Sequence, residues 1–374
     1  MSTTSLRLLA IVSLVTTVAL WFPQSVRASS AYFQTNLSSD VPGLAANTDP
    51  NLKNPWGMSF SPTSPFWVSD QFTGVSTLYT GTGSSIPLVV TVPPTSPPPA
   101  GPTGQVFNNT TSFTLPGGGA SHFIFDTLSG TVDAWGGGTS ATVMVTKTGA
   151  VYTGLAIDSV GMNNYLYAAN NAGGIDVYDA TFTDVTGTTF AGKFVDPSPV
   201  PGFSAFNIQN VDGNLYVEYA ALTAMGAPLP GGYVDEFDSA GNFIARVATG
   251  GPVDAPWGIT MAPSSGFGTY SGDLLIGNFG NGQINAFNPT TNAYLGTLDG
   301  SNGMPIVNPF LWAINFRTGG PGATADALYF TAGINNQQDG LFGSIQLVPE
   351  PGAAGTTALA LILALGAFRR RLSR

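Results

Sequence analysis

The chain has 374 residues, of which 9% are charged, and its 48 glycines and 28 prolines exceed the usual shares of about 7% and 5%. It contains no cysteine, which excludes disulfides and thiolate metal sites. Six of the 11 Lys and Arg residues lie in the two terminal segments described below, which leaves 5 for the rest of a chain that has 21 Asp and Glu residues in all. We therefore do not expect nucleic acid as a partner, because phosphate binding needs a basic surface.

The first 28 residues have the order of a secretory signal. Arg7 precedes an apolar stretch from Leu8 to Phe22, and small residues surround Ala28. This order predicts a signal peptide over residues 1–28 with cleavage after Ala28. The alternative is a membrane anchor, for which the stretch falls short of the ~20 residues that span a bilayer. Both interpretations take the body of the chain out of the cytoplasm.

Two patterns recur along residues 29–348. In "DQFTGVSTLY", "DTLSGTVDAW" and "NFGNGQINAF", an Asp or Asn precedes a glycine by four positions, and alternation then ends on an aromatic residue. The second pattern is a strand start, and it falls at Trp56, Phe107, Leu155, Phe206, Trp257 and Trp312, with spacings of 51, 48, 51, 51 and 55 residues. A period near 50 with short strands is typical of a β-propeller. We predict an all-β domain over residues 29–348, a six-bladed β-propeller with four-stranded blades.

The sixth repeat offers only three strands, and the segment "SAYFQTNL" at residues 30–37 belongs to no repeat. If this segment forms the outer strand of the last blade, it closes the ring and removes both exposed edges. The repeated Asp70 and Asp126 fall between the second and third strands of their repeats. We interpret them as turn-capping residues, with a metal-ligand role as the alternative.

The segment "PPTSPPPAGPTG" at residues 93–104 joins the first and second repeats. It is too rich in proline to pair as a strand, so it predicts a stiff loop at the mouth of the channel.

Several stretches of the body carry a family resemblance. "YFQTNLSSD", "DPNLKNPWGMSFSPTSPFWVSD" and "LYFTAGINNQQDGLFGSI" resemble a family of uncharacterised secreted bacterial proteins, many of which end in a PEP-CTERM tail. The resemblance implies export and a propeller similar to NHL and lactonase-type propellers. It implies no established activity and brings no catalytic residue.

The residues themselves also indicate no catalytic site. His122 is the one histidine, and no serine lies in a Gly-x-Ser-x-Gly elbow, which argues against a Ser-His-Asp triad. We expect His122 to be a partly buried strand residue. The "GGG" runs at 117–119 and 136–138 do not lie between a strand and a helix, so a nucleotide site is not expected either.

The loops that lead into the innermost strands converge at one mouth of a propeller channel. The polar residues expected at this mouth are Asn54, Asn207, Asp254 and Asn308. Their oxygens would suit Ca²⁺, which takes 6–8 oxygen ligands. The alternative is that they cap turns before Pro-aromatic steps. Trp56, Trp257 and Trp312 are interpreted as blade-to-blade core, with a sugar-stacking rim as the alternative.

The last residues, 349–374, resemble the PEP-CTERM sorting signal of Gram-negative bacteria. Pro349, Glu350 and Pro351 match its motif, and 16 small or apolar residues follow. The basic cluster after them is Arg369, Arg370 and Arg371. The resemblance implies recognition by an exosortase, transient contact with the inner membrane, removal of the tail and delivery to the cell surface or extracellular matrix. A permanent tail anchor is the alternative.

Two functions remain open at this point. The first is a non-enzymatic surface or matrix propeller with a binding or scaffolding role, for which extracellular polysaccharide is a candidate partner. The second is a Ca²⁺-dependent lactonase-like or hydrolase-like propeller enzyme. Fold alone does not separate them, because propellers host many functions on one scaffold.

Overall fold

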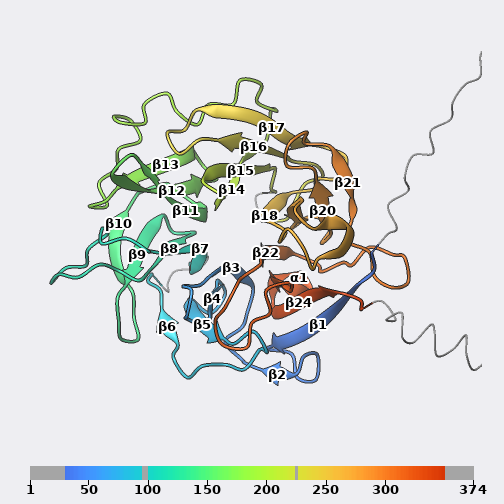
Figure 1. Ribbon diagram of the computed structural model, residues 1–374. Helices are drawn as coiled ribbons and strands as arrows, with labels where there is room; N and C mark the ends of the chain where they lie inside the picture. The colour runs from blue at the N-terminus through green and yellow to red at the C-terminus, as the bar shows by residue number, and fades with distance from the viewer. Residues whose placement is uncertain (1–29, 95–99, 224–225, 350–374) are drawn as a thin grey trace, which may run out of the picture.

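The computed structural model describes residues 30–94, 100–223 and 226–349. Strands account for nearly all regular structure in these ranges, and they form six sheets that stand as blades around a central axis (Figure 1). The predicted six-bladed β-propeller is confirmed. In the first five blades the strand nearest the axis comes first in the run of the chain and the next strands follow outward, whereas the sixth blade takes its outer strands from the N-terminal end of the described chain.

The blades follow one another around the ring. The first contains β3 (Pro55–Ser59), β4 (Phe66–Asp70), β5 (Val75–Tyr79) and β6 (Val90–Thr91). The second contains β7 (Pro102–Phe107), β8 (Phe123–Thr127), β9 (Thr131–Trp135) and β10 (Thr142–Thr146). The third contains β11 (Tyr152–Val160), β12 (Asn163–Asn170) and β13 (Gly174–Asp179). It has no fourth strand, because the Thr-, Gly- and Pro-rich residues 180–203 make only an isolated bridge.

The other three blades complete the ring. The fourth contains β14 (Ser204–Val211), β15 (Asn214–Ala220), β16 (Tyr233–Phe237) and β17 (Phe243–Thr249). The fifth contains β18 (Pro256–Met261), β19 (Leu274–Asn278), β20 (Ile284–Phe287), β21 (Tyr294–Thr297) and the 3-10 turn η1 (Gly268–Tyr270) between β18 and β19. The sixth contains β22 (Leu311–Asn315), β23 (Leu328–Ala332), the single turn α1 (Ile334–Gln337) and β24 (Leu341–Leu347).

The ring closes where the first strand meets the last. β1 (Tyr32–Ser39) pairs antiparallel with β24, from Tyr32 opposite Leu347 to Ser39 opposite Leu341. The short β2 (Asn47–Thr48) adds a parallel fifth strand outside β1. The predicted closure of the last blade by the N-terminal strand is therefore confirmed, with the strand beginning and ending two residues later than the predicted segment.

All six innermost strands carry a β-bulge at the same structural position. The bulged residues include Trp56, Thr103, Thr153, Phe206, Trp257 and Trp312. A bulge bends its strand and re-aims a side chain. The sequence pattern placed the equivalents of Trp56 in the second and third blades at Phe107 and Leu155. This prediction was wrong, because the equivalent residues are Thr103 and Thr153.

Glycine follows the bulged residue where neighbouring blades approach most closely. A Cβ on Gly57 would lie 2.4 Å from the carbonyl oxygen of Thr103 in the second blade. A Cβ on Gly104 would lie 2.3 Å from the backbone nitrogen of Leu155 in the third. Both distances are far inside van der Waals contact, so only glycine lets these inner strands pack side by side.

The repeated aspartates bind strands together, and their carboxylates do not cap the turns. In the first blade the backbone carbonyl of Asp70 accepts from Gly74, while its Oδ2 accepts from the hydroxyl of Thr77 at 2.6 Å. In the second blade Asp126 Oδ1 accepts from the backbone nitrogen of Gly104 at 2.6 Å. The turn-capping role expected for these two carboxylates was wrong.

One further expectation is decided, and two lie outside the described residues. β7 begins at Pro102, so the proline-rich segment 93–104 does supply the start of a strand. Within ranges 30–94, 100–223 and 226–349, no helix has the length and apolar character needed to cross a membrane. The expected signal peptide 1–28 and the apolar segment of the tail fall beyond these ranges.

Candidate functional site

A layer of aromatic side chains fills the centre of the ring. The bulged residues Trp56 and Trp312 stack with ring centroids 3.5 Å apart, and Trp257 meets both edge-on at 6.2 and 5.6 Å. Phe206 and Phe279 complete the layer, with Phe279 stacked 4.2 Å from Trp312. These five rings are at most 5% exposed, so the interpretation of the tryptophans as core is confirmed.

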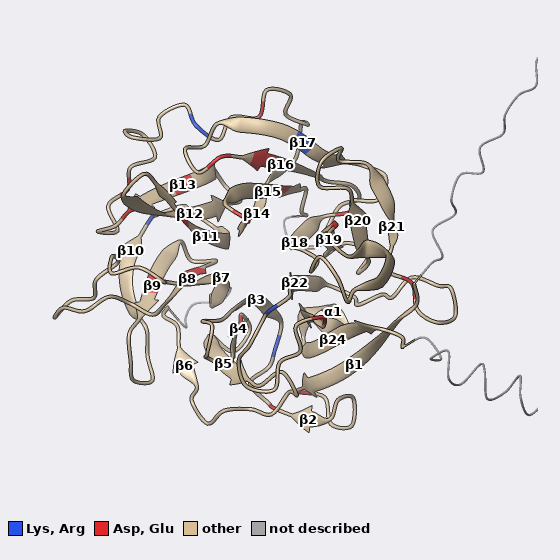
Figure 2. Ribbon diagram, in the orientation of Figure 1, with Lys and Arg blue, Asp and Glu red and all other residues tan. Residues whose placement is uncertain are grey.

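A cavity of about 550 Å³ lies at the channel mouth, on one side of this aromatic layer. We call it the mouth cavity. Its lining residues are Trp56, Gln71, Leu128, Val151, Thr153, Asn171, Phe206, Leu222, Thr223, Gly226, Trp312 and Gln337. None of these twelve is charged, and they combine aromatic faces with three amides and two hydroxyls. Charged residues are sparse over the whole ring (Figure 2).

Amide side chains form one wall of the mouth cavity. Asn54 donates through Nδ2 to Gln71 Oε1 at 2.9 Å and to Gln337 Oε1 at 3.4 Å, and its Oδ1 accepts from Trp312 Nε1 at 3.1 Å. Gln71 in turn donates to the carbonyl of Ala100 at 2.6 Å. Asn54 thus fixes the orientation of three side chains that line the cavity.

Gln337 reaches this wall from a strained segment. Asn335, Asn336 and Gln337 have φ values of 53°, 55° and 65°, so α1 is a left-handed turn built from three residues that are not glycine. Left-handed residues cost roughly 1–2 kcal/mol each, although asparagine tolerates them best. Strain of this kind gathers at functional sites, and here it places an amide against the cavity.

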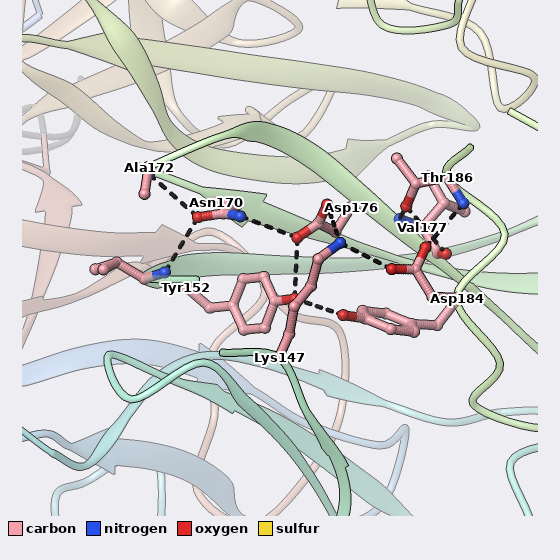
Figure 3. Close-up of polar contacts among 10 residues, drawn as sticks. Lys147, Tyr152, Asn170, Ala172, Asp176, Val177, Asp184 and Thr186 are labelled. Carbon is pink, nitrogen blue, oxygen red and sulfur yellow. Dashed lines mark hydrogen bonds and ion pairs between the residues drawn. The ribbon is translucent and has the colours of Figure 1, made fainter. Parts of the chain in front are cut away.

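A polar network holds the opposite wall (Figure 3). Lys147 donates to Asp176 at 2.7 Å and to Asp184 at 2.8 Å, and Asp176 Oδ2 accepts from Tyr152 at 3.0 Å and from Asn170 at 3.0 Å. Asn170 Oδ1 then accepts from the backbone of Val151 and Ala172, both at 3.1 Å. The network therefore fixes the two backbone segments that carry the lining residues Val151 and Asn171.

The same network changes the pKa values of its members. Burial alone would lower the pKa of Lys147, but the hydrogen bonds to Asp176 and Asp184 outweigh it and raise that pKa. Burial raises the pKa of Tyr152, and the hydroxyl of Tyr178 beside it adds to the increase. The lysine stays charged and the tyrosine neutral at physiological pH, so the network is constant there.

A smaller cavity of about 210 Å³ lies on the other side of the aromatic layer. It is lined by residues of all six innermost strands, with Trp257, Gln105 and Asn207 among them. Trp257 belongs to this side, whereas Trp56 and Trp312 line the mouth cavity. The aromatic layer therefore divides the channel into two separate spaces.

The four polar residues expected at the channel mouth bind different partners. Asn54 supports the wall of the mouth cavity, as described above. Asn207 lines the smaller cavity and donates to the carbonyl of Trp257 at 2.5 Å. Asp254 Oδ1 accepts from the backbone of Gly231 at 2.9 Å. Asn308 exchanges two hydrogen bonds with Gln34 of β1, at 2.8 and 3.0 Å.

The described ranges hold no cluster of three or more His, Asp or Glu side chains placed to bind a metal ion. His122 is exposed, precedes β8 and lies 6.2 Å from the ring of Trp135. It lines neither channel cavity, and the partly buried position expected for it was wrong.

Two neighbouring carboxyl groups are buried in the second blade. Burial raises the pKa of Asp126 to about 7, although hydrogen bonds from Thr103 and Gly104 oppose it. Burial also raises the pKa of Asp133 to about 7, and the charge of Asp126 adds to this. Both side chains are completely buried and line neither channel cavity, so they bear on stability and not on binding.

Comparison with known proteins defines the relatives. No protein-family model matches the chain. Uncharacterized protein L690 of Acanthamoeba polyphaga mimivirus is 30% identical over 342 residues, which cover 86% of this chain and 88% of that protein. The chain belongs to the L690 family. Uncharacterized protein R648 of the same virus is 29% identical over 341 residues, which cover 85% of this chain and 81% of R648.

The relationship to a bacterial PEP-CTERM family was therefore wrong, because the relatives that show the L690 family come from a giant virus. Pro349 is the last described residue of the expected sorting motif. The other members of that motif, Glu350, Pro351, Arg369, Arg370 and Arg371, lie outside the described residues.

Solved structures match the L690-family chain only at low similarity. A streptogramin B lyase structure has a TM-score of 0.46 and 12% identity, and the match covers 85% of this chain and 98% of the lyase. Raptor of Chaetomium thermophilum has a TM-score of 0.49 and 10% identity, and the match covers 86% of this chain and 30% of Raptor. These values are too low to carry over a site or an activity.

Sequence reasoning found Asn54 in the L690-family chain but missed most lining residues of the mouth cavity. Gln71, Asn171 and Gln337 come from turns, where amides are common for reasons unrelated to binding. One usable signal was the run "INNQQ" at 334–338, in which four consecutive amides follow a strand and Gly333, so the turn itself falls on residues other than glycine.

Proposed function

We propose that this protein is a binding propeller that takes an uncharged ligand into the mouth cavity. The observation that carries the proposal is the lining of that cavity, which holds aromatic faces, three amides and no charged group. An apolar cavity with a few placed polar groups is the usual form of a small-molecule site. The volume of about 550 Å³ falls within the range of about 300–1,000 Å³ that such sites occupy.

The lining chemistry supports a neutral sugar unit or a molecule like it. Aromatic rings pack against the apolar faces of a sugar, and amides can both donate to and accept from hydroxyl groups. A charged ligand would find no counter-charge in this lining and would lose its hydration on entering. A neutral extracellular polysaccharide remains the partner that we propose.

A direct binding measurement tests this function. We expect 4-methylumbelliferyl glucoside to bind in a fluorescence titration, and the same fluorophore carrying a phosphate in place of glucose to bind much more weakly. Leu128→Trp should fill part of the cavity and weaken binding at least about tenfold. Met162→Trp serves as the matched control, because Met162 is 97% exposed and lines no cavity described here.

The outcomes separate clearly. Equal binding of the neutral and the anionic compounds would contradict the proposed selectivity. Binding that Leu128→Trp leaves unchanged would place the ligand elsewhere on the molecule.

We also propose that the chain is exported. The support is the sequence of residues 1–28, where Arg7 precedes the apolar stretch from Leu8 to Phe22. Protein recovered outside the producing cells should begin at Ser29 by mass spectrometry, and Leu14→Arg should keep the chain inside. Exported protein that still carries Arg7 would contradict the proposed cleavage.

A further inference from the structure

A third cavity, of about 410 Å³, lies at the opposite face of the ring from the mouth cavity. It lies where the connections between first and second strands of the fifth, sixth and first blades meet. We call it the arginine cavity. Its lining residues are Phe60, Pro62, Met261, Pro263, Phe316, Arg317, Thr318 and Ala325. Seven of the eight offer carbon surface or a hydroxyl, and Arg317 supplies the one charge.

Arg317 is buried with part of its hydrogen-bonding capacity unused. The residue is 3% exposed. Its Nη2 donates to the carbonyl oxygens of Ser61 at 3.1 Å and Ser64 at 2.9 Å. Nε and Nη1 donate to no described residue and lie just beneath the cavity surface, so a ligand in the cavity reaches them when the guanidinium turns toward it. A guanidinium carries five N–H groups, so several donors remain unpaired at a site where unpaired donors are costly.

The other basic residues of the described ranges are satisfied differently. Lys53, Lys147 and Arg246 each pair with two carboxylates. Lys193 donates to the side-chain oxygen of Asn242 at 2.7 Å. Arg317 forms no ion pair with a carboxylate in the described part of the chain, although acidic residues outnumber basic ones there. A buried charge without a partner is rare, because desolvation costs several kcal/mol per ion.

Aromatic rings compensate Arg317 only in part. The guanidinium carbon lies 4.5 Å from the ring centroid of Phe60 and 4.6 Å from that of Phe66. Cation–π contacts offset only part of the cost of burying the charge. Burial lowers the pKa of Arg317, but an arginine stays protonated in proteins, so the positive charge persists.

We propose that the arginine cavity binds a small organic monocarboxylate, whose carboxylate pairs with Arg317 and whose apolar body packs against Phe60, Met261 and Phe316. Arginine is the side chain best suited to a carboxylate, because its planar donors match the carboxylate oxygens. The hydroxyl of Thr318 supplies a further donor at the same wall. A ligand with a single charge would neutralise the cation, and the remaining lining would accept its carbon skeleton.

This site is independent of the mouth cavity, so either proposal can fail alone. The test uses phenylacetate and its neutral amide, phenylacetamide, as matched compounds with the full chain. We expect phenylacetate to raise the melting temperature at millimolar concentration, because a ligand that binds only the native state stabilises it by mass action. Phenylacetamide should give little or no increase.

Two variants locate the binding. Arg317→Met keeps an apolar chain but removes the charge, and it should weaken phenylacetate binding at least about tenfold in isothermal titration. Since this variant loses the bonds to Ser61 and Ser64 and can misfold, Ala325→Trp provides a second route. Ala325 is exposed and lines the cavity, so tryptophan there should block phenylacetate binding. Without ligand, this variant should melt at the same temperature as the parent chain. Met162→Trp is the control.

Three results would overturn the proposal. One is the absence of phenylacetate binding to the parent chain. The second is an equal shift by phenylacetate and phenylacetamide, and the third is phenylacetate binding that Ala325→Trp leaves unchanged. Inorganic sulfate that matches the effect of phenylacetate would overturn the assignment to an organic acid.

Discussion

The two sides of the inner ring follow one backbone plan but carry different side chains. The first, fourth, fifth and sixth blades place an aromatic residue at the bulge of the innermost strand, whereas the second and third place Thr103 and Thr153 there. The aromatic residues meet in one layer across the axis. The mouth cavity takes in Thr153 of the threonine side, where no large ring fills the space.

This comparison shows how a repeat makes room for a site. The bulge and the close packing of neighbouring strands are kept in both groups of blades, so the backbone scaffold stays the same. The side chain at the bulge differs in size, and the small Thr153 leaves space that a large ring would fill. Trp257 of the fifth blade links the two groups of blades, because its Nε1 donates to the carbonyl of Thr153 in the third at 2.9 Å.

The largest effect on stability should come from the four blades with an aromatic residue at the bulge. Trp312→Ala removes a ring that touches Trp56, Trp257, Phe206 and Phe279, and we expect a loss of about 3–5 kcal/mol in the free energy of unfolding. Chemical denaturation with a constant m-value would measure it. A loss below about 1 kcal/mol would show that the aromatic layer does not hold the ring together.

A pH dependence of stability should come from the second blade, one of the two with threonine at the bulge. The folded pKa of Asp126 and of Asp133 is about 7, above the unfolded value of about 3.9, because burial favours the neutral form. The native state thus holds protons that the unfolded chain releases. This contribution to stability is complete below about pH 4 and is lost as the pH rises to about 7.

Melting temperatures between pH 5 and pH 8 test this effect. We expect them to fall with rising pH in the parent chain. Asp126→Asn keeps an oxygen acceptor for Thr103 and Gly104 but cannot ionise, so its decline should be shallower. Parallel curves for the parent and the variant would contradict the assignment.

A smaller effect should separate the two threonines. The hydroxyl of Thr103 lies 2.7 Å from Asp126 Oδ1 and 2.9 Å from the carbonyl oxygen of Tyr152 and shares its one hydrogen between them, so Thr103→Val leaves a buried acceptor unsatisfied and should cost about 1–3 kcal/mol. Thr153 donates only a long bond of 3.3 Å to the carbonyl of Ala169, and Thr153→Val should cost less than about 1 kcal/mol. Equal losses of unfolding free energy in the two variants would contradict this difference between the two threonines.

The smallest effect should be that of calcium. Asn54 and Asp254 are tied to different partners, so we expect added Ca²⁺ to leave the melting temperature of the parent unchanged. A rise that Asp254→Ala abolishes would instead support the calcium site considered from the sequence.

The fold was predictable because its signals repeat. A period near 50 residues set the number of blades, and one strand too few in the last repeat indicated closure by the N-terminal segment, which β1 confirms. The position of the bulge within each innermost strand was less predictable. Phe107 and Leu155 look like inner-strand landmarks in the sequence, but the bulges lie at Thr103 and Thr153, where nothing apolar marks them.

The candidate site was predictable only in part. Local order placed Asn54 near the channel mouth, yet the same reasoning grouped it with Asn207, Asp254 and Asn308, which bind elsewhere. Whether an amide faces a cavity or a backbone carbonyl depends on strand twist and on packing between blades. Arg317 shows the same limit, because no local pattern tells that a lone arginine is buried without a carboxylate.

The pairing of β1 with β24 has a consequence for synthesis on the ribosome. About 300 residues separate the two strands, and at about 5–20 residues per second the ribosome needs roughly 15–60 s to make them. Through that interval β1 lacks its long antiparallel partner β24 and has only the two-residue strand β2 beside it, while the early blades can already fold from local contacts. An unpaired strand invites association with other chains. The nascent protein therefore exposes an edge of β1 to such association until β24 has been made.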